Sequence, residues 1–465
     1  MSFPKYPEYK DSGVEWLGEV PKHWRLHKIA WHVPFTVGWT PPSSNEEYYD
    51  GDHLWVTIAD LRSHRIGDTK SKITDKAVME KGARKSPAGS LLFSFKLTVG
   101  SVAFLEKSAY TNEAIAAFEP NSHLDLRFWA YAAPIFIPKY GRENIYGALL
   151  LNQELISSVR YVAPKIAEQE QIAAFLDHET GKIDALIEEQ RRLIELLKEK
   201  RQAVISHAVT KGLDPNVPMK DPGVEWLGEV PAHWDVVPLG LLARKIQTGP
   251  FGSQLHSHEY VEGGVPVINP SSIVDGCIVP DKRSTVGRVV VERLNHHKLV
   301  ENELVVGRRG EMGRCAVVSC KEAGWLCGTG SMKVSLSERV DPWFLSHFMR
   351  IPLVRGLLQL ESVGSTMDNL NPELLSRVRV PIPPIAEQRH LVARIEENAD
   401  QTSRLINEAV KGSELLLGRR SSLISAAVTG KIDVRGWSAG AEAEEPGLAM
   451  VAEESAGYSA QGGAQ

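Results

Sequence analysis

"DSGVEWLGEVPKHW" occupies residues 11–24, and the chain writes it again as "DPGVEWLGEVPAHW" at residues 221–234. Twelve of the fourteen letters match, although 210 positions separate the two copies. The repeat divides the 465-residue chain into two related halves. We call each copy, with the residues that lead into it, an arm.

Two further pairs of words locate the parts that kept their length. "IAEQ" stands at residues 166–169 and 385–388, and "ISHAVTKGLD" from Ile205 matches "ISAAVTGKID" from Ile424. Both pairs are 219 positions apart, so the interval between the two words is 39 residues in each half. Between the arm and IAEQ, by contrast, the second copy is nine residues longer and its letters have diverged. Each half therefore consists of an arm, a variable segment and a segment of fixed length.

The segments of fixed length are predicted to be long helices. Apolar residues in the first of them recur at steps of three and four, which is typical of a helix with a coiled-coil stripe; they are Ile172, Leu176, Ile183, Leu186, Leu193, Leu197 and Val204. A helix of about 45 residues needs a partner for such a stripe, and the equal lengths favour packing of the two helices on each other. The alternative is that each helix is buried in its own domain.

The variable segments are predicted to be mixed α/β domains with many short strands. "HLWVTIADL", "GSLLFSFKL", "SVAFLEK" and "AIAAFEP" read as strands in the first, and "VPVINPSSI", "ENELVVGRR", "RCAVVSC" and "SMKVSLS" in the second. A weak echo aligns "LLFSFKLTVGSVA" from Leu91 with "LVVGRRGEMGRCA" from Leu304, which places Gly100 over Gly313. Both segments are thus expected to share one fold and to differ in surface residues.

Composition excludes several classes of protein. No apolar run approaches the ~20 residues of a membrane span, the N-terminus lacks the features of a signal peptide, and four cysteines do not suggest a disulfide framework, so a reducing cytoplasm fits. The net charge of −5 is misleading, because the stretch after Trp437 carries five Glu and no Lys or Arg. That acidic tail is expected to be disordered. A nucleic-acid surface on the remaining, neutral body must therefore be local.

The sequence contains no recognisable catalytic constellation. The phosphate-binding Gly-x4-Gly-Lys-Ser/Thr loop, a GxGxxG turn after a strand, HExxH and GxSxG are all missing. The histidines around residues 256–258 and 296–297 have no carboxylate or cysteine at a metal-ligand spacing. We therefore expect no catalytic residue and no metal site in this chain.

Local clusters of basic residues indicate where nucleic acid could bind. Residues 61–107 contain ten Lys or Arg against four Asp or Glu, and residues 282–314 contain eight against four. Arg and Lys neutralise phosphates and can also bond the guanine edge. The alternative is an ordinary solvent-exposed surface, but the basic stretches occur at the same position in both halves, which favours a DNA-binding surface. The candidate DNA contacts are Arg62, Arg65, Arg84, Lys85, Lys96, Arg308, Arg309 and Arg314.

The whole pattern resembles the specificity subunit of type I restriction–modification systems. The resemblance rests on the two "GVEWLGEVPxHW" words, the two "IAEQ" words and the "ISxAVT" endings, and it covers about residues 5–436. It implies an α+β fold with two mixed α/β target recognition domains, separated by two long antiparallel coiled-coil helices in a pseudo-two-fold repeat. The implied segments are an arm (1–24), recognition domain 1 (25–163), helix 1 (164–212), a second arm (213–234), recognition domain 2 (235–382), helix 2 (383–430) and a C-terminal segment with the tail (431–465).

The resemblance also implies partners. Each recognition domain would read one half of a bipartite site in double-stranded DNA. The helices would set the spacer and dock two methyltransferase (modification) subunits, with restriction/translocase subunits in the full complex and no membrane. No cofactor is expected in this chain, because S-adenosylmethionine, ATP and Mg²⁺ would belong to the partners. Residues expected to serve packing or partner contact are Trp16, Trp24, Trp226, Trp234, Ile166, Gln169, Leu186, Leu193, Leu197, Ile385 and Gln388.

Two other classes of function remain open on sequence alone. The chain could be a DNA-modifying enzyme of unrecognised type, which turnover with S-adenosylmethionine or Mg²⁺ would reveal. It could also be a degenerate scaffold that binds DNA without sequence preference.

Overall fold

The structure is a computed structural model that describes residues 3–145, 147, 149–362 and 369–439. It forms two compact units. Unit 1 comprises residues 1–189 and 413–465, and unit 2 comprises residues 190–412. The acidic tail predicted to be disordered lies, from residue 440 onward, outside the described residues. Each unit contains one arm, one recognition domain and part of both long helices.

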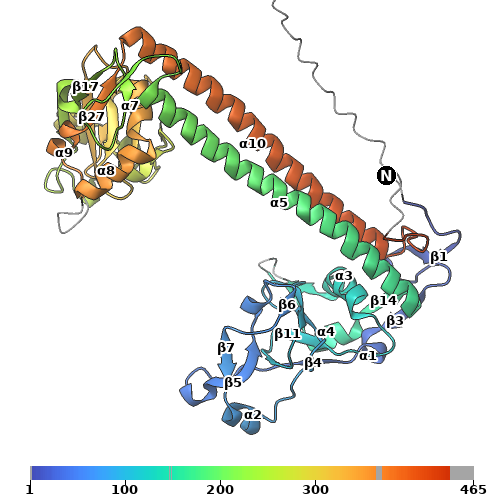
Figure 1. The fold of residues 1–465 in the computed structure, drawn as a ribbon. Helices are drawn as coiled ribbons and strands as arrows, with labels where there is room; N and C mark the ends of the chain where they lie inside the picture. The colour runs from blue at the N-terminus through green and yellow to red at the C-terminus, as the bar shows by residue number, and fades with distance from the viewer. Residues whose placement is uncertain (1–2, 146, 148, 363–368, 440–465) are drawn as a thin grey trace, which may run out of the picture. The chain divides into compact units, whose positions relative to one another are not determined.

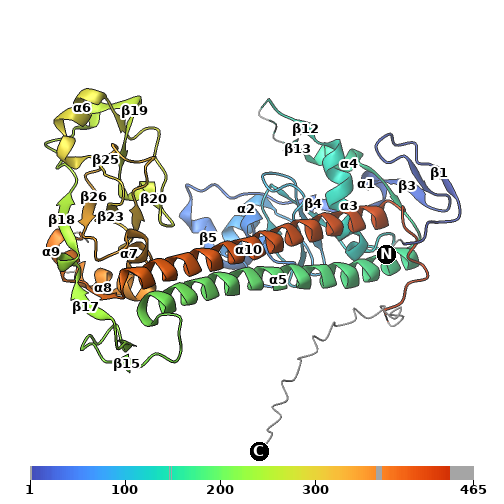
Figure 2. The ribbon, with the colours of Figure 1, turned by 90° about the horizontal axis from the view of Figure 1, so that it is seen from above.

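Each arm folds as a small antiparallel hairpin followed by a strand that joins the domain to its long helix. In unit 1 the hairpin is β1 (Tyr9–Asp11) with β2 (Glu19–Pro21), and β3 (Arg25–Lys28) pairs with β14 (Arg160–Ala163) just before the helix. Figure 2 shows β1 and β3 next to the N-terminal end of α5. In unit 2 the counterparts are β15 (Met219–Lys220) with β16 (Val230–Pro231), and β17 (Asp235–Pro238) with β27 (Arg379–Ile382).

Two sheets of three or more strands form the body of recognition domain 1. The larger has the order β4-β11-β8-β9-β6, with strands Phe35–Val37, Ile115–Phe118, Leu91–Ser94, Val102–Leu105 and Arg65–Ile66. The smaller has the order β10-β5-β7, with strands Tyr110–Thr111, Tyr49–Val56 and Ser71–Ile73. The remaining elements are β12 (Arg142–Glu143) with β13 (Leu149–Leu150), α1 (Ile29–His32), α2 (Asp75–Lys81), α3 (Leu126–Phe136) and α4 (Gln153–Ser158).

Recognition domain 2 repeats this topology with a different sequence, except that, among the described residues, its larger sheet has no strand at the place of β6. Its larger sheet has the order β18-β26-β23-β24, with strands Ala243–Thr248, Ser331–Leu336, Leu304–Gly307 and Cys315–Val317 (Figure 2). Its second sheet has the order β22-β19-β25, with strands Thr285–Val286, Tyr260–Ile268 and Leu326–Cys327. The other elements are β20 (Ile273–Val274) with β21 (Cys277–Ile278), α6 (Arg288–Arg293), α7 (Pro342–Met349), α8 (Pro352–Ser362) and α9 (Pro372–Arg377).

The strand predictions are confirmed, because every segment that reads as a strand contains one. The shared topology is confirmed as well. β5 pairs parallel with β10 in the first domain, as β19 does with β25 in the second. The two variable segments are therefore two versions of one fold.

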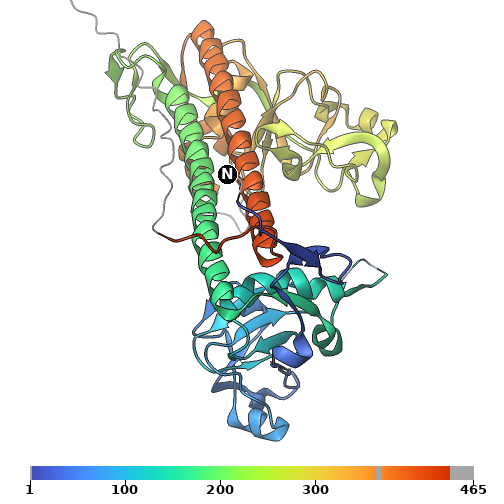
Figure 3. The same ribbon diagram turned by 90° about the vertical axis from the view of Figure 1, so that its right-hand side faces the viewer.

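The segments of fixed length form the helices α5 (Ile166–Lys211) and α10 (Ile385–Val428), drawn in green and orange-red in Figures 1 and 3. In unit 1 the start of α5 packs on the end of α10, where Ile172 and Leu176 share a core with Val428. In unit 2 the end of α5 packs on the start of α10, where Ile205 and Leu391 share a core. Within each unit the helices therefore run antiparallel, and the alternative of two separately buried helices is wrong.

The predicted seam of α5 is wrong by one residue in its middle. Leu186 and Leu193 are 46% and 43% exposed, whereas Ile187 is 5% exposed. The inward positions run through the polar residues Thr180 and Gln190, and Gly412 of α10 faces Gln190. The spacing of the leucines does not predict this seam, because polar side chains occupy two of its positions. Leu197 is half-buried.

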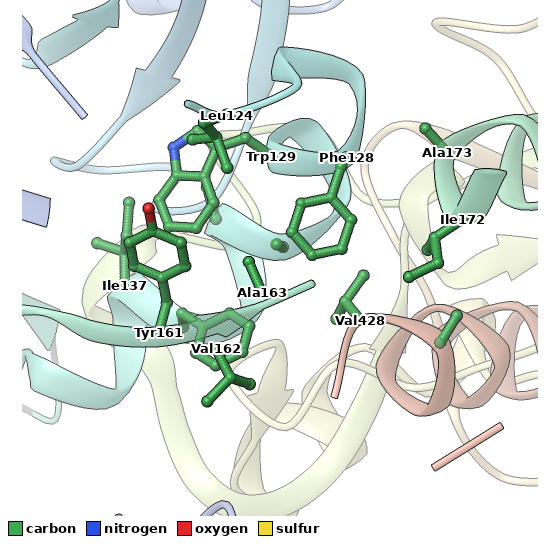
Figure 4. Packing of buried hydrophobic residues seen from close by; sticks show 14 of the residues in the cluster. Leu124, Phe128, Trp129, Ile137, Tyr161, Val162, Ala163, Ile172, Ala173 and Val428 are labelled. Carbon is green, nitrogen blue, oxygen red and sulfur yellow. The ribbon is translucent and has the colours of Figure 1, made fainter. Parts of the chain in front are cut away.

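The core of unit 1 joins the recognition domain to both helices. Trp129 of α3 packs against Tyr161 of β14, and the same cluster includes Phe128 of α3, Ile172 of α5 and Val428 of α10 (Figure 4). Each fully buried aromatic or branched side chain contributes about 1.5–3 kcal/mol to the stability of the folded state. The cluster thus fixes the recognition domain on the helix pair of its own unit.

Candidate nucleic-acid interface

The repeated words of the arm and of IAEQ meet at one carboxylate in each unit. Glu168 accepts hydrogen bonds from the Tyr6 hydroxyl at 2.8 Å and from the indole Nε1 of Trp24 at 3.0 Å, and His23 Nε2 lies 2.8 Å from its Oε2. Burial, followed by the bond to Glu168, raises the pKa of Tyr6, so this phenol remains a donor. The Trp24 side chain is fully buried. We call this arrangement the arm clamp.

Unit 2 builds the same arm clamp around Glu387. It accepts from Trp234 Nε1 at 3.0 Å, and His233 Nε2 lies 2.9 Å from its other oxygen. Buried polar groups that lose their partner cost about 1–3 kcal/mol each. The letters "HW" and the Glu of IAEQ therefore depend on each other, which accounts for their identity in both halves.

The Gln of each IAEQ word holds the recognition domain. Gln169 accepts from the backbone N–H of Asp125 at 2.9 Å and donates to Pro164 O at 2.9 Å. Gln388 likewise accepts from the N–H of Asp341 at 2.7 Å and donates to Pro383 O at 2.8 Å. Asp125 and Asp341 in turn cap the first turns of α3 and α7.

Neighbouring residues of the motif complete the junction. Ile166 and Ile385 begin the two long helices and are half-buried. The first tryptophan of each repeated motif packs on its recognition domain. The ring centroids of Trp16 and Phe136 are 5.4 Å apart, and those of Trp226 and Phe348 are 6.4 Å apart. All four repeated tryptophans thus contact the domain or the helix of their own unit.

The hairpins β8–β9 and β23–β24 are structurally equivalent. Ser94 N donates to Ser101 O at 2.9 Å, and Gly307 N donates to Arg314 O at 2.8 Å, which is the same bond 213 positions later. Gly100 and Gly313 have φ of +96° and +77°. We call residues 95–101 the first hairpin tip and residues 308–314 the second. The sequence echo that predicted this equivalence is confirmed.

The equivalence separates the two neighbouring arginines of the second hairpin tip. Arg309 takes the place of Lys96, and both are exposed, whereas Arg308 takes the place of the buried Phe95. Arg308 Nε donates to Leu370 O at 3.1 Å, and the Leu370 N–H donates to Arg308 O at 2.9 Å. Burial, and then the charge of Arg309, lowers the pKa of Arg308. The sequence alignment of the two hairpins, which places Lys96 over Arg309 and Phe95 over Arg308, therefore agrees with the structure.

The other basic candidates do not form one patch. Arg62 and Arg65 are exposed around β6, which pairs with β9 beside the first hairpin tip, and Arg65 and Gly100 line the same hollow of 610 Å³. Arg84 and Lys85 precede β8, at its other end. Arg84 pairs with Glu119 at 2.9 Å, and Lys85 lies over the Tyr110 ring.

In the second domain, Arg314, the last residue of the second hairpin tip, is half-buried and lines a small pocket. Arg314 and Arg355 both pair with Glu311, at 2.8 and 2.5 Å. The pocket of 130 Å³ is also lined by Arg350, whose guanidinium donates to Asp275 O at 3.0 Å. Among the basic residues of the second tip, Arg314 pairs with Glu311 and Arg308 is bonded to the backbone of Leu370, whereas Arg309 is exposed.

One feature of the first hairpin tip has no signal in the sequence. Leu97 has φ of +59° and is 90% exposed. The left-handed region costs a residue with a Cβ about 1–2 kcal/mol. The matching position in the second tip is Gly310, with φ of +80°.

The described residues contain no group of three or more His, Cys, Asp or Glu that could hold a metal ion. Burial raises the pKa of Cys315 to about 11 and that of Cys327 to about 12, so both remain protonated thiols near neutral pH. Among the helices that the structure describes, none is long and apolar enough to cross a membrane.

Comparison with known proteins decides the family. The family model described as "Type I restriction modification DNA specificity domain" matches residues 35–196 and 231–411. The chain belongs to this family of type I DNA specificity domains. It carries two copies of the domain. The first match begins in recognition domain 1 and the second at the end of the second arm, and the two matches run into α5 and α10.

Curated relatives carry the same description. The putative type I restriction enzyme MjaX specificity subunit of Methanocaldococcus jannaschii is 23% identical over 94% of this chain and 99% of its own length. The MjaIX specificity subunit of the same organism is 24% identical, over 58% of this chain and 62% of its own length. The EcoBI specificity subunit of Escherichia coli is 22% identical over 70% of this chain and 71% of its own.

Solved structures show the fold of the specificity domain family. A chain from a structure on complex assembly and conformational transition of a type I R-M system superposes with a TM-score of 0.64 at 15% identity, covering 88% of this chain and 98% of that one. The HsdS subunit of Thermoanaerobacter tengcongensis gives a TM-score of 0.51 at 15% identity with the same coverage. The α+β fold with two recognition domains is therefore confirmed.

Proposed function

We propose that this chain is the subunit that gives a type I restriction–modification complex its DNA sequence specificity. Each recognition domain reads one half of a bipartite site in double-stranded DNA, and the helices α5 and α10 set the spacer between the halves. The chain itself performs no catalysis. The relatives named as specificity subunits support this proposal.

One observation carries the proposal. The two halves share the arm clamp and the fold of the recognition domain, whereas the sequences of their hairpin tips differ. The arm clamps around Glu168 and Glu387 share the His–Trp pair, and the larger sheets share the order of four strands, β4-β11-β8-β9 in the first domain and β18-β26-β23-β24 in the second. The first hairpin tip nevertheless reads "FKLTVGS" and the second "RRGEMGR". A framework that is constant beside a tip that varies is what two different half-sites on one regular duplex require.

The same duplication supports a partner that binds twice. We propose that two modification subunits dock on the arms and helices, and that restriction/translocase subunits join them in the cytoplasm. S-adenosylmethionine, ATP and Mg²⁺ would be bound by those partners. One of the superposed chains comes from work on assembly of a type I R-M system, which agrees with a multisubunit complex.

Arg309→Ala tests the base-reading role of the second hairpin tip. In the assembled complex, we expect discrimination at one base pair of the second half-site to fall by about 1–3 kcal/mol, because an Arg–guanine contact is worth that amount. The measurement is methylation across a library in which each half-site is randomised in turn, read by methylation-aware sequencing. The first half-site should stay strict.

Arg308→Ala and Lys96→Ala are the matched controls. Arg308→Ala removes the contact to Leu370 and should lower stability by about 1 kcal/mol. Lys96→Ala should relax only the first half-site. Uniform loss over both half-sites, with a flatter salt dependence, would reduce Arg309 to a phosphate contact. A wild-type complex without any sequence preference would contradict the proposed function and favour a degenerate scaffold.

A further inference from the structure

The first hairpin tip combines backbone strain with an apolar side chain that gains nothing from burial. Among the described residues, the non-glycine residues with positive φ are Asp50, Leu97, Asp275 and Asn302. Asp and Asn tolerate this region because their short polar side chains bond locally, whereas leucine does not. Leu97 is also 90% exposed. The residue thus adds backbone strain without contributing to a core.

The equivalent position shows that the fold does not require a leucine. Gly310 occupies the same place in the second hairpin tip with φ of +80°, which glycine adopts without strain. Strain of this kind points to function when an outlier is observed. A ligand outside the chain that buries the Leu97 side chain would account for both features.

The neighbours of Leu97 indicate which ligand this is. Lys96 is exposed beside it, and Arg65 lies near the same tip across β9. Cationic side chains around an apolar tip suit the DNA duplex, whose phosphates attract them. The major groove is wide enough for a two-stranded β-ribbon, and its apolar feature is the 5-methyl group of thymine.

We propose that Leu97 reads a thymine of the first half-site by packing on its 5-methyl group. This inference rests on the proposed function of the first recognition domain. The strained turn holds the side chain outward, so its apolar surface is available to the groove before DNA binds. Lys96 then supplies the polar contact next to it, to a base edge or to a phosphate.

The test compares thymine with uracil, which lacks the 5-methyl group. The full chain assembled with its modification subunits is assayed for methylation of duplexes in which each thymine of the first half-site is replaced by uracil in turn. With the wild type, replacing thymine by uracil should slow methylation roughly fourfold at one position of the first half-site. This is the factor expected for the loss of one buried methyl-sized group. Leu97→Asn should be slower on the thymine duplex and indifferent to uracil at that position, while Leu97→Met should keep the sensitivity.

Stability separates this role from packing within the domain. Asn accepts positive φ more readily than Leu, so Leu97→Asn should unfold at the same temperature as the wild type or higher. The response of the second half-site should not change. Equal uracil effects in wild type and Leu97→Asn, a first half-site without thymine, or earlier unfolding of Leu97→Asn would each overturn the proposal.

Insertion of Leu97 as a wedge between base pairs is the alternative role, and duplexes that carry 2-aminopurine beside each thymine of the first half-site test it. Apolar side chains can unstack a base step from the minor groove. A rise in 2-aminopurine fluorescence that needs Leu97, with no uracil effect, would assign the side chain to that role and contradict the methyl contact. Failure of Arg309→Ala alone would leave the Leu97 result standing, because the two tips act on different half-sites.

Discussion

Replacing Glu168 with alanine is expected to lower the free energy of unfolding of unit 1 by about 3 kcal/mol, because hydrogen bonds to a charged group contribute about 1.5–3 kcal/mol each. Three side chains would lose their acceptor, among them the fully buried indole of Trp24. The Glu168 side chain is 12% exposed, so water does not readily replace it. Thermal unfolding of the full chain measures the loss.

Hydrogen exchange locates the effect of Glu168→Ala. Amides of the first arm, residues 6–24, should lose protection, while those of the second arm should keep it. Glu170→Ala is the matched control, since Glu170 is an exposed carboxylate two residues further along α5. Unchanged protection of the first arm would show that the arm is held by its apolar contacts alone.

Glu387→Ala should have a smaller effect of the same kind in unit 2. Its carboxylate holds His233 and Trp234, and it is 31% exposed. Water can therefore reach the released groups more easily. An equal or larger loss than in unit 1 would mean that the number of donors does not determine the strength of the clamp.

Deleting seven residues from each long helix, 187–193 and 409–415, is expected to shorten the spacer of the DNA site by about three base pairs. Seven helical residues span about 10 Å, and base pairs rise 3.4 Å each. Seven residues are close to two turns, so the antiparallel seam keeps its register. The bases of both half-sites should stay the same. Methylation-aware sequencing of a host that carries the variant measures the new spacer.

Deletion from α5 alone is the control for the paired deletion. It leaves the two helices unequal, removes the register between their seams and should abolish methylation. The paired variant must remain folded, which circular dichroism establishes. A folded, active variant with an unaltered spacer would show that the helices do not set the spacing.

Some of the fold could be predicted because it depends on residues that are close together in the sequence. Strands in the recognition domains follow from short apolar runs bounded by Gly and Pro. The two long helices follow from periodic residues and equal intervals. The seam could not be predicted residue by residue, because Leu186 and Ile187 are equally apolar and only the partner helix decides which of them is buried.

The candidate DNA interface was predicted to the level of the hairpin and not of the side chain. Aligning Gly100 with Gly313 located the equivalent turns. Arg308 and Arg309 are the same letter, yet one binds the backbone of Leu370 and the other is exposed. Leu97 is an ordinary leucine in sequence, since a backbone angle leaves no trace in composition.

The sequence by itself determined the duplicated plan, the two long helices, the family resemblance and the position of the variable hairpins. These properties depend on periodicity, interval and repeated words, which are readable without knowing where the chain goes. The tertiary structure alone decided that Glu168 receives Tyr6, His23 and Trp24, and that Gln169 holds the cap of α3. It also decided which tip residues face outward. Such contacts join positions far apart in the chain, and a shift of one residue in a turn exchanges a buried side chain for an exposed one, so only the folded path of the backbone determines them.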